Sequence, residues 1–343
     1  MSEEKTSHTG QKRLSDIPFS VLDLAPVVTG STPADAYRNS MELARQAEQW
    51  GYHRYWLAEH HNMPGIASSA TSVLIGHIAG GTSRIRVGSG GIMLPNHAPL
   101  AIAEQFGTLE TLYPGRIDLG LGRAPGSDQR TMHALRPDGR NGHDFPEQLH
   151  ELRAYFKPTG PAAVHAFPGE GLDIPIWLLG SSGFSAQLAG QLGLPFAFAS
   201  HFSPEYMLPA LELYRSSFQP SEVLEAPRAM VAVNVIAADT DAQAKRTATS
   251  MYQTFLDMIR GRTPGKLKPP VDNMDELWSD YEKAAVQRQL GSSIVGSPET
   301  VKAKLQAFLD VTQADEIMVA AHIYEHQERL RSFEIIAEMT GRK

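Results

Sequence analysis

Histidine stands at several points of this 343-residue sequence where a short apolar run ends. His60 and His61 follow one such run, and His97, His201 and His322 each follow another. The pKa of imidazole lies near neutral pH, so histidine suits proton transfer there, and neutral imidazole also binds metal ions. If the runs are parallel strands, their carboxyl ends meet at one face and the histidines become candidates for one site.

The adjacent pair His60-His61 allows three interpretations. Along an extended segment, neighbouring side chains point to opposite faces, so only one of the two would enter a site. That histidine would act as a general base, bind a metal, or simply pack. Zinc would need two or three further ligands, and His97, His201 and Asp23 are the candidates. No His-x-His or His-x3-His spacing occurs in these segments, and the residues alone leave all three interpretations open.

Arg123 and the turn Gly180-Ser181-Ser182 suggest an anion site. The turn precedes an expected helix, whose first backbone N–H groups and dipole favour a negative charge. Arg123 follows the neighbouring apolar run, and its guanidinium can hold a phosphate through two hydrogen bonds. Under the alternative interpretation, Ser182 merely caps the helix and Arg123 forms a surface ion pair.

Glycines interrupt the third apolar run at Gly88, Gly90 and Gly91. Glycine inside a strand commonly marks a bulge or the close approach of a ligand. A tight contact between a helix and the sheet would equally require the missing side chains.

The elements that must position these residues alternate in type. Short apolar runs alternate with amphipathic stretches, a pattern typical of parallel β/α folds. We expect eight strands, at residues 19–23, 55–58, 85–94, 117–121, 175–179, 196–199, 229–237 and 316–319. This count predicts a (β/α)8 barrel, whose ligands bind at the carboxyl ends of the strands. A doubly wound sheet is the rival fold, but no glycine-rich dinucleotide fingerprint follows the first run.

Domain organisation follows from where this alternation stops. We expect a flexible N-terminal tail at residues 1–15 and one barrel domain over residues 16–343. Residues 122–144 are predicted as a long loop. Residues 260–293 are predicted as a mobile insertion after the seventh strand. The first helix should begin with Thr32 as its N-cap and Pro33 in its first turn, and should end before Gly51.

Composition excludes several classes of function. The chain has no cysteine, which rules out disulfides, thiolate nucleophiles and cysteine-ligated metal clusters. A net charge of −7 gives no electrostatic footprint for nucleic acid. No apolar run is long enough to cross a membrane and no signal peptide is evident, so a cytoplasmic location is expected.

Three segments, 56–61, 87–95 and 115–123, together resemble the bacterial luciferase-like flavin-dependent monooxygenases in order and interval. Segments 123–128 and 178–182 resemble a group of that family, the luciferase family oxidoreductases, related to alkanal monooxygenases. The resemblance extends from about residue 19 to about residue 339. It implies a (β/α)8 barrel that binds reduced FMN supplied by a separate flavin reductase. Such an enzyme uses O2 as co-substrate to oxidise a small organic substrate, such as an aldehyde.

The resemblance also implies roles for individual residues. His60 matches the catalytic histidine, which acts as a base or stabilises the oxygenated flavin, and His61 is its supporting neighbour. Gly90-Gly91 matches a non-proline cis peptide beneath the flavin ring, and Arg123 matches the phosphate-binding arginine. The cofactor-binding turn comprises Gly180, Ser181 and Ser182 with Phe184. Residues 260–293 match a mobile lid, a homodimer is the family expectation, and no metal is expected.

Several alternatives remain at this stage. One is a deazaflavin (F420)-dependent oxidoreductase of the same superfamily, which would transfer hydride without oxygen. A second is a flavin-binding protein without turnover, and a third is a metal-dependent barrel hydrolase. We do not expect light emission, and the sequence does not identify the substrate.

Overall fold

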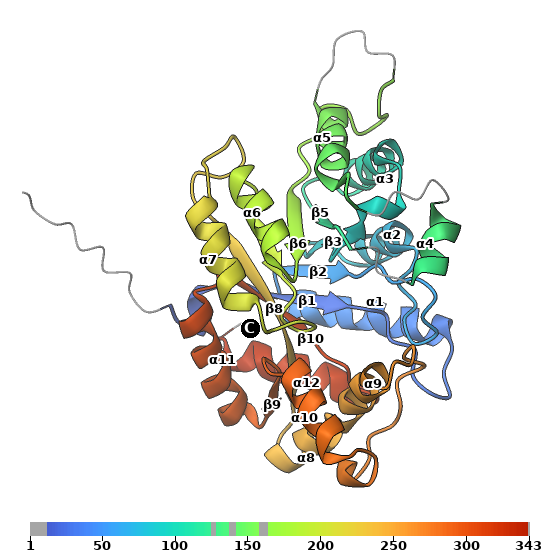
Figure 1. Cartoon of the computed structure of the whole chain (residues 1–343), viewed down its shortest axis with the longest axis vertical. Helices are drawn as coiled ribbons and strands as arrows, with labels where there is room; N and C mark the ends of the chain where they lie inside the picture. The colour runs from blue at the N-terminus through green and yellow to red at the C-terminus, as the bar shows by residue number, and fades with distance from the viewer. Residues whose placement is uncertain (1–11, 125–127, 137–141, 158–163, 342–343) are drawn as a thin grey trace, which may run out of the picture.

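Eight parallel strands close into a barrel, and helices surround them (Figure 1). The computed structural model describes residues 12–124, 128–136, 142–157 and 164–341. The barrel strands are β1 (Phe19–Asp23), β2 (Arg54–Leu57), β3 (Arg86–Ser89), β5 (Ile117–Gly122), β6 (Ile176–Gly180), β7 (Phe196–Phe198), β8 (Ala229–Ala237) and β10 (Glu316–Ala320). Pairing of β10 with both β1 and β8 closes the ring, which confirms the predicted (β/α)8 barrel.

The helices lie outside this ring, between successive strands. They are α1 (Pro33–Gln49), α2 (Thr71–Gly81), α3 (Pro99–Leu112), α4 (Gln129–Leu135), α5 (Phe145–Phe156), α6 (Gly183–Gln191), α7 (Met207–Ser217), α8 (Asp241–Thr247), α9 (Thr249–Ile259), α10 (Asp280–Gln289), α11 (Pro298–Thr312) and α12 (His326–Met339). Helix α1 begins as predicted, because the Thr32 side chain accepts from the Asp35 backbone N–H and Pro33 occupies the first turn. It ends before Gly51, whose φ of 77° is in the left-handed region.

Three predicted elements differ from those observed. The third run is two strands, β3 and β4 (Ile92–Met93), separated at Gly90-Gly91. The amphipathic stretch after β8, which the alternation predicts as one helix, is interrupted at Ala248, giving α8 and α9. The predicted loop 122–144 contains α4, which begins where the Asp128 side chain accepts from two backbone N–H groups. Residues 125–127 and 137–141 of that loop lie outside the described residues.

The predicted tail is wrong at its C-terminal end. Leu14 is buried within a short 3-10 helix, η1 (Leu14–Asp16). The Lys12 ammonium lies 2.7 Å from a carboxylate oxygen of Asp315, so residues 12–15 pack onto the barrel. Residues 1–11 lie outside the described part of the chain.

Charged side chains fill the amino-terminal end of the barrel interior. Alternate residues of each strand face inward, and these positions place Arg54, Asp118 and Glu316 in one layer. Arg54 Nη1 lies 2.6 Å from Asp118 Oδ2, and its Nε lies 3.0 Å from Glu316 Oε1. Arg86 pairs with Asp118 and Arg228 pairs with Glu316. Every buried carboxylate in this layer therefore has a cationic partner, as burial of charge requires.

At the next inward positions along each strand, the layer is apolar. Its buried members are Leu22, Trp56, Ala58, Trp177, Ala197, Met230, Ala232, Met318 and Ala320. The Trp56 and Trp177 rings meet edge to face with centroids 5.6 Å apart, a favoured aromatic geometry. This layer separates the charged end from the carboxyl-terminal mouth and forms the floor of that mouth.

The insertion at residues 260–293 is joined to the barrel mouth on two sides. Its backbone at Leu267 exchanges hydrogen bonds with Val27 and Thr29 of the loop after β1. Near its other end, Ser292 Oγ donates to the Ser200 carbonyl at 2.7 Å, and α10 packs beside α9. The insertion contains η3 (Met274–Glu276) and α10, and a further short strand, β9 (Ile294–Gly296), pairs in parallel with the end of β8. Its mobility stays a prediction.

The loop after β1 also binds the loop that carries the histidine pair. We call residues 58–70 the histidine loop. Val27 N–H donates to the Gly65 carbonyl at 2.9 Å, and Ala67 N–H donates to the Ala25 carbonyl at 3.1 Å. Gly65 meets the insertion directly: a Cβ atom on it would lie 2.1 Å from the Gly265 carbonyl oxygen. The loop after β1, the histidine loop and the insertion are therefore in mutual contact.

Replacing Arg54 with methionine should strongly destabilise the protein, because Asp118 and Glu316 would each lose a buried partner. We expect the free energy of unfolding to fall by about 3–5 kcal/mol, measured by urea denaturation. Arg246→Met is the matched control, since the Arg246–Asp272 pair is exposed and should contribute about 1 kcal/mol or less. Equal losses in the two variants would show that the charged layer does not stabilise the barrel.

Candidate functional site

The mouth of the barrel is lined by the residues that follow the apolar layer. On β2 the inward positions are Arg54, Trp56 and Ala58, and the alternation continues to His60. On β8 the inward series Met230 and Ala232 continues to Asn234, which is fully buried. His60 and Asn234 thus come from strands on different sides of the ring, above a common apolar floor.

Glu59 faces the other way and holds several groups around it. His61 Nε2 lies 2.8 Å from Glu59 Oε1, and His97 Nε2 lies 2.9 Å from the same oxygen. The Asn96 side-chain amide donates to Glu59 Oε1 at 3.1 Å, and the Met93 backbone N–H donates to Oε2 at 2.9 Å. One buried carboxylate therefore joins the histidine loop to the segment after β3, which includes η2 (Leu94–Asn96).

The Glu59 carboxylate is ionised at ordinary pH. Burial pushes its pKa upward, but the hydrogen bonds from His61, His97 and Met93 outweigh burial and lower the pKa to about 2. Because an ionised carboxylate can only accept, Nε2 of both histidines must carry the hydrogen. His61 and His97 are thus fixed in tautomer and orientation by Glu59.

A second contact fixes the histidine loop from outside. Asn62, whose φ is 55°, donates from its side-chain amide to Asp128 Oδ2 at 3.1 Å. Asp128 caps α4, and Arg136 just beyond that helix donates to the carbonyls of Pro95 and His97. The segments that follow β2, β3 and β5 are therefore bound into one rim.

His60 belongs to a different group of histidines from His61. Burial, together with electrostatic repulsion from His322 and His60, lowers the pKa of His201 to about 3. Burial is also the main reason that the pKa of His322 falls to about 4, with Arg329 and His60 contributing. The three rings are therefore close enough to interact, and the adjacent histidines do point to opposite sides, as predicted.

Arg123 and the start of α6 come together as predicted for an anion site. The Arg123 guanidinium carbon lies 4.1 Å from the centroid of the Phe184 ring. Phe184 is in the first turn of α6, and Ser182 is the N-cap residue but makes no side-chain capping hydrogen bond. Gly180 packs closely on this helix, since a Cβ there would lie 2.7 Å from Ser185 Cβ. Among the described residues, Arg123 makes no ion pair and Ser182 no side-chain cap, so the alternative interpretation is not supported there. Ser181 lies between Gly180 and Ser182 on the same turn.

The peptide bond between Gly90 and Gly91 is cis, as the resemblance implies. A Cβ on Gly90 would lie 2.7 Å from Leu22 Cδ1, and one on Gly91 would lie 2.8 Å from the Gly120 carbonyl oxygen. These glycines are therefore required by packing within the barrel wall, between β3 and β4.

Glu59 and Asn234 were not among the predicted site residues, and His97, His201 and His322 were candidates without an assigned role beyond possible metal binding. Glu59 and three of the histidines stand at or shortly after the end of an apolar run, and this position already indicates that they lie at the barrel mouth. Asn234 carried a weaker signal, as the one amide inside the apolar run 229–237. Over the described ranges, no group of three or more acidic or histidine side chains is arranged to hold a metal ion.

Comparison with known proteins agrees with this geometry. Residues 17–315 match the family model described as luciferase-like monooxygenase. The chain belongs to this family. It is 58% identical over 325 residues to a luciferase-like monooxygenase of Escherichia coli (strain K12), covering 94% of this chain and 97% of that protein.

Solved structures support the same assignment. The luciferase-like chain superposes on apo-MsnO8 with a TM-score of 0.85 and 36% identity, covering 95% of this chain and 99% of that one. It also shares its fold with the oxygenating constituent of 3,6-diketocamphane monooxygenase from Pseudomonas putida, solved in complex with FMN. That match has a TM-score of 0.71 and 20% identity, covering 94% of this chain and 98% of the other.

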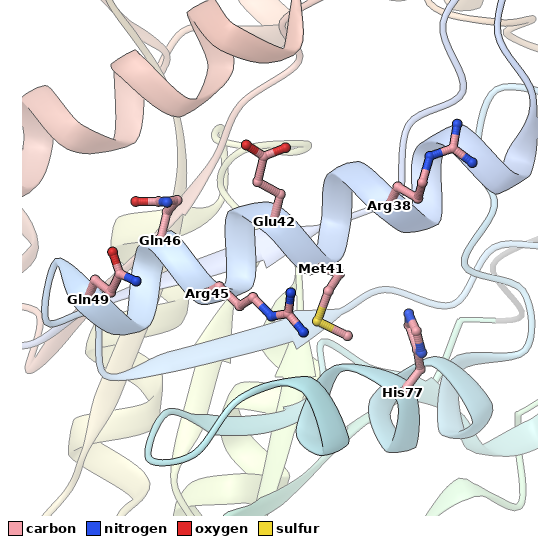
Figure 2. Close-up of a pocket in the computed structure, with 7 residues that line it drawn as sticks. All are labelled: Arg38, Met41, Glu42, Arg45, Gln46, Gln49 and His77. Atoms are coloured by element: carbon pink, nitrogen blue, oxygen red, sulfur yellow. The ribbon is translucent and has the colours of Figure 1, made fainter.

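A groove of about 540 Å³ lies outside the barrel, between α1 and α2. Figure 2 shows Met41 and Arg45 of α1 pointing toward α2, which carries His77. Its other lining residues are Arg38, Glu42, Gln46 and Gln49. This groove does not include the mouth residues of the luciferase-like barrel.

No helix in the described segments is long and apolar enough to span a membrane.

Replacing Glu59 with glutamine should cost stability in a pH-dependent way. The folded pKa of about 2 lies below the ordinary value of 4.5, so the carboxylate stabilises the fold above pH 4.5 and loses this effect as pH falls toward 2. We expect Glu59→Gln to lower the free energy of unfolding by about 3 kcal/mol near neutral pH, and by less than about half of that at pH 3. Urea denaturation at a series of pH values measures this difference.

Glu42→Gln is the matched control, because Glu42 also pairs with a histidine, His326, but is half exposed. Its effect should stay within about 1 kcal/mol. A Glu59→Gln loss that does not change with pH would contradict the lowered pKa.

Proposed function

We propose that this protein is an FMN-dependent monooxygenase that uses reduced FMN and O2 to oxidise a small organic substrate. The observation that carries the proposal is the placement of Arg123 against Phe184 at the start of α6, where Ser182 leaves the helix uncapped by a side chain. Family membership and the FMN-bound structure of the same fold support this cofactor.

The residues fit an FMN phosphate. Backbone N–H groups in the first turn of α6 lack intrahelical partners, and the helix dipole favours an anion there. The Ser181 and Ser182 hydroxyls add donors, and Arg123 supplies a permanent positive charge. The flavin ring would then lie toward Gly90-Gly91, where β3 and β4 present no side chain to the mouth.

Bound reduced FMN supplies the electrons that activate O2, so that one oxygen atom enters the substrate and the other leaves as water. The protein's contribution is to hold this reaction in a site of low water content. The apolar layer closes the mouth from below, and the insertion contacts its rim at Leu267 and Ser292.

His60 is the residue we assign to proton transfer. It follows β2, where the inward alternation of Arg54, Trp56 and Ala58 continues to it beyond the floor of the mouth. His61 is a positioning residue, because the ionised Glu59 fixes its ring together with that of His97. Both roles agree with the family resemblance.

Reduced FMN would come from a separate flavin reductase, as the family resemblance implies. A homodimer remains our expectation, as does the absence of light emission. Deazaflavin is the competing cofactor, and parallel titration of the protein with FMN and with F420 distinguishes the two.

Arg123→Met should weaken FMN binding by about 10- to 150-fold, because a charged hydrogen bond to the phosphate is lost. Riboflavin lacks the phosphate and provides the control, so its dissociation constant should not change. Flavin fluorescence titration of the wild type and the variant gives both values. Equal weakening of FMN and riboflavin would show that Arg123 does not contact the phosphate.

His60→Ala should leave the dissociation constant of FMN unchanged and reduce turnover by about 10²- to 10⁴-fold, as expected for loss of proton transfer. Oxygen consumption with reduced FMN and a panel of aldehydes measures turnover. His77→Ala on the outside of α2 is the control and should retain wild-type turnover. Wild-type protein that binds no flavin would overturn the proposed function.

A further inference from the structure

Part of the barrel mouth is left over once the proposed flavin contacts are placed, and the inference below rests on that proposed function. Arg123, the α6 turn and Gly90-Gly91 belong to β3, β5 and β6. The arc formed by β7, β8 and β10 is separate from them, and polar side chains line it. These are His201, Asn234 and His322, each of which follows or ends an inward series of the barrel.

Asn234 is buried with its amide in a defined orientation. Its Nδ2 donates to the His201 carbonyl at 2.6 Å, and it also lies 3.3 Å from Ser293 Oγ. A carbonyl oxygen can only accept, so the Asn234 amide cannot be turned over. Its Oδ1 is buried and has no hydrogen-bond partner among the described residues. This oxygen requires a donor, because a buried amide oxygen without one is costly.

His201, whose carbonyl accepts from Asn234, carries a second buried polar atom in the same arc. His201 Nδ1 is buried and, within the described ranges, also has no hydrogen-bond partner. The lowered pKa of His201, about 3, keeps its ring neutral at ordinary pH. In a neutral imidazole one nitrogen donates and the other accepts, so Nδ1 can provide a hydrogen to a ligand carbonyl.

We infer that Asn234 Oδ1 and His201 Nδ1 bind the polar group of the substrate, and that this group is neutral and carries a donor beside an acceptor. A carboxamide or a hydroxyl meets this requirement. A carboxylate does not, because its oxygens only accept and would face Asn234 Oδ1 without a hydrogen between them. The apolar floor below, with Trp56, Trp177 and Met318, suits an aliphatic or aromatic body.

Two small probes that differ in this property test the inference. Hexanamide and hexanoate have similar shapes, but only the amide has N–H donors and no charge. Ligand-observed NMR titration of the purified protein at neutral pH gives both dissociation constants. We expect hexanamide to bind at least about tenfold more tightly than hexanoate. The amide N–H would donate to the buried Asn234 Oδ1, whereas hexanoate would leave this oxygen unpaired.

Variants of His201 locate the effect. His201→Leu should weaken hexanamide binding by about tenfold and leave hexanoate unchanged, whereas His201→Gln retains a donor and should restore much of the affinity. His77→Leu makes the same change on the outside of α2 and should behave as wild type. Thermal unfolding of each variant verifies that it is folded.

Equal binding of the two probes, absence of saturable hexanamide binding, or wild-type affinity in folded His201→Leu would each overturn the inference. The dissociation constant of FMN, measured on the same samples, separates this result from the proposed function. Flavin binding without amide preference contradicts the substrate site alone. Amide preference without flavin binding contradicts the proposed function and leaves the binding site in place.

Discussion

Closing eight parallel strands into a ring sends every second side chain into one enclosed column, and that column must be filled without leaving a buried charge unpaired. The chain fills it in layers. Arg54 joins Asp118 and Glu316 at the amino-terminal end, an apolar layer around Trp56 and Trp177 follows, and polar side chains appear only at the mouth. Each layer limits which side chains can occupy the next one. The charged layer is sealed from the mouth, so polar chemistry is confined to residues that extend the strands by one or two inward positions, such as His60 and Asn234.

The two adjacent histidines of the histidine loop lie in different surroundings. The carboxylate between this loop and the segment after β3 contacts only one of them. Glu59 is ionised and accepts from His61, His97 and the Met93 backbone, which binds the rim of the mouth together. His60, on the opposite face of the same segment, joins the group with His201 and His322. Rigid attachment of one histidine thereby supports the other at the proposed reaction site, in agreement with the value of supporting contacts around a reactive group.

Much of the fold and the position of the mouth could be predicted from the sequence, because the alternation of apolar runs and amphipathic stretches is strong and barrel ligands bind at strand ends. The meeting of Arg123 with the start of α6 followed from the same rule. Interruptions within elements were harder to predict. The break between β3 and β4 at Gly90-Gly91 and the break between α8 and α9 at Ala248 depend on tertiary packing, which hydrophobic periodicity alone does not show. The partners of Glu59 and the orientation of Asn234 could not be predicted either, since they depend on segments that are distant in sequence and adjacent only after the barrel closes.

The crossing of Gly65 and Gly265 links two segments that a comparison of sequences would treat as independent. Gly65 leaves no room for a larger residue at the crossing, since even a methyl group on it would overlap the Gly265 backbone, whereas a Cβ on Gly265 would meet nothing within 4 Å. The histidine loop, which carries the residue proposed for proton transfer, therefore constrains the path that the insertion backbone can take past it. Transplanting the insertion of a relative into this barrel, a natural way to alter its substrate range, would succeed only if the partner loop after β2 were transferred with it.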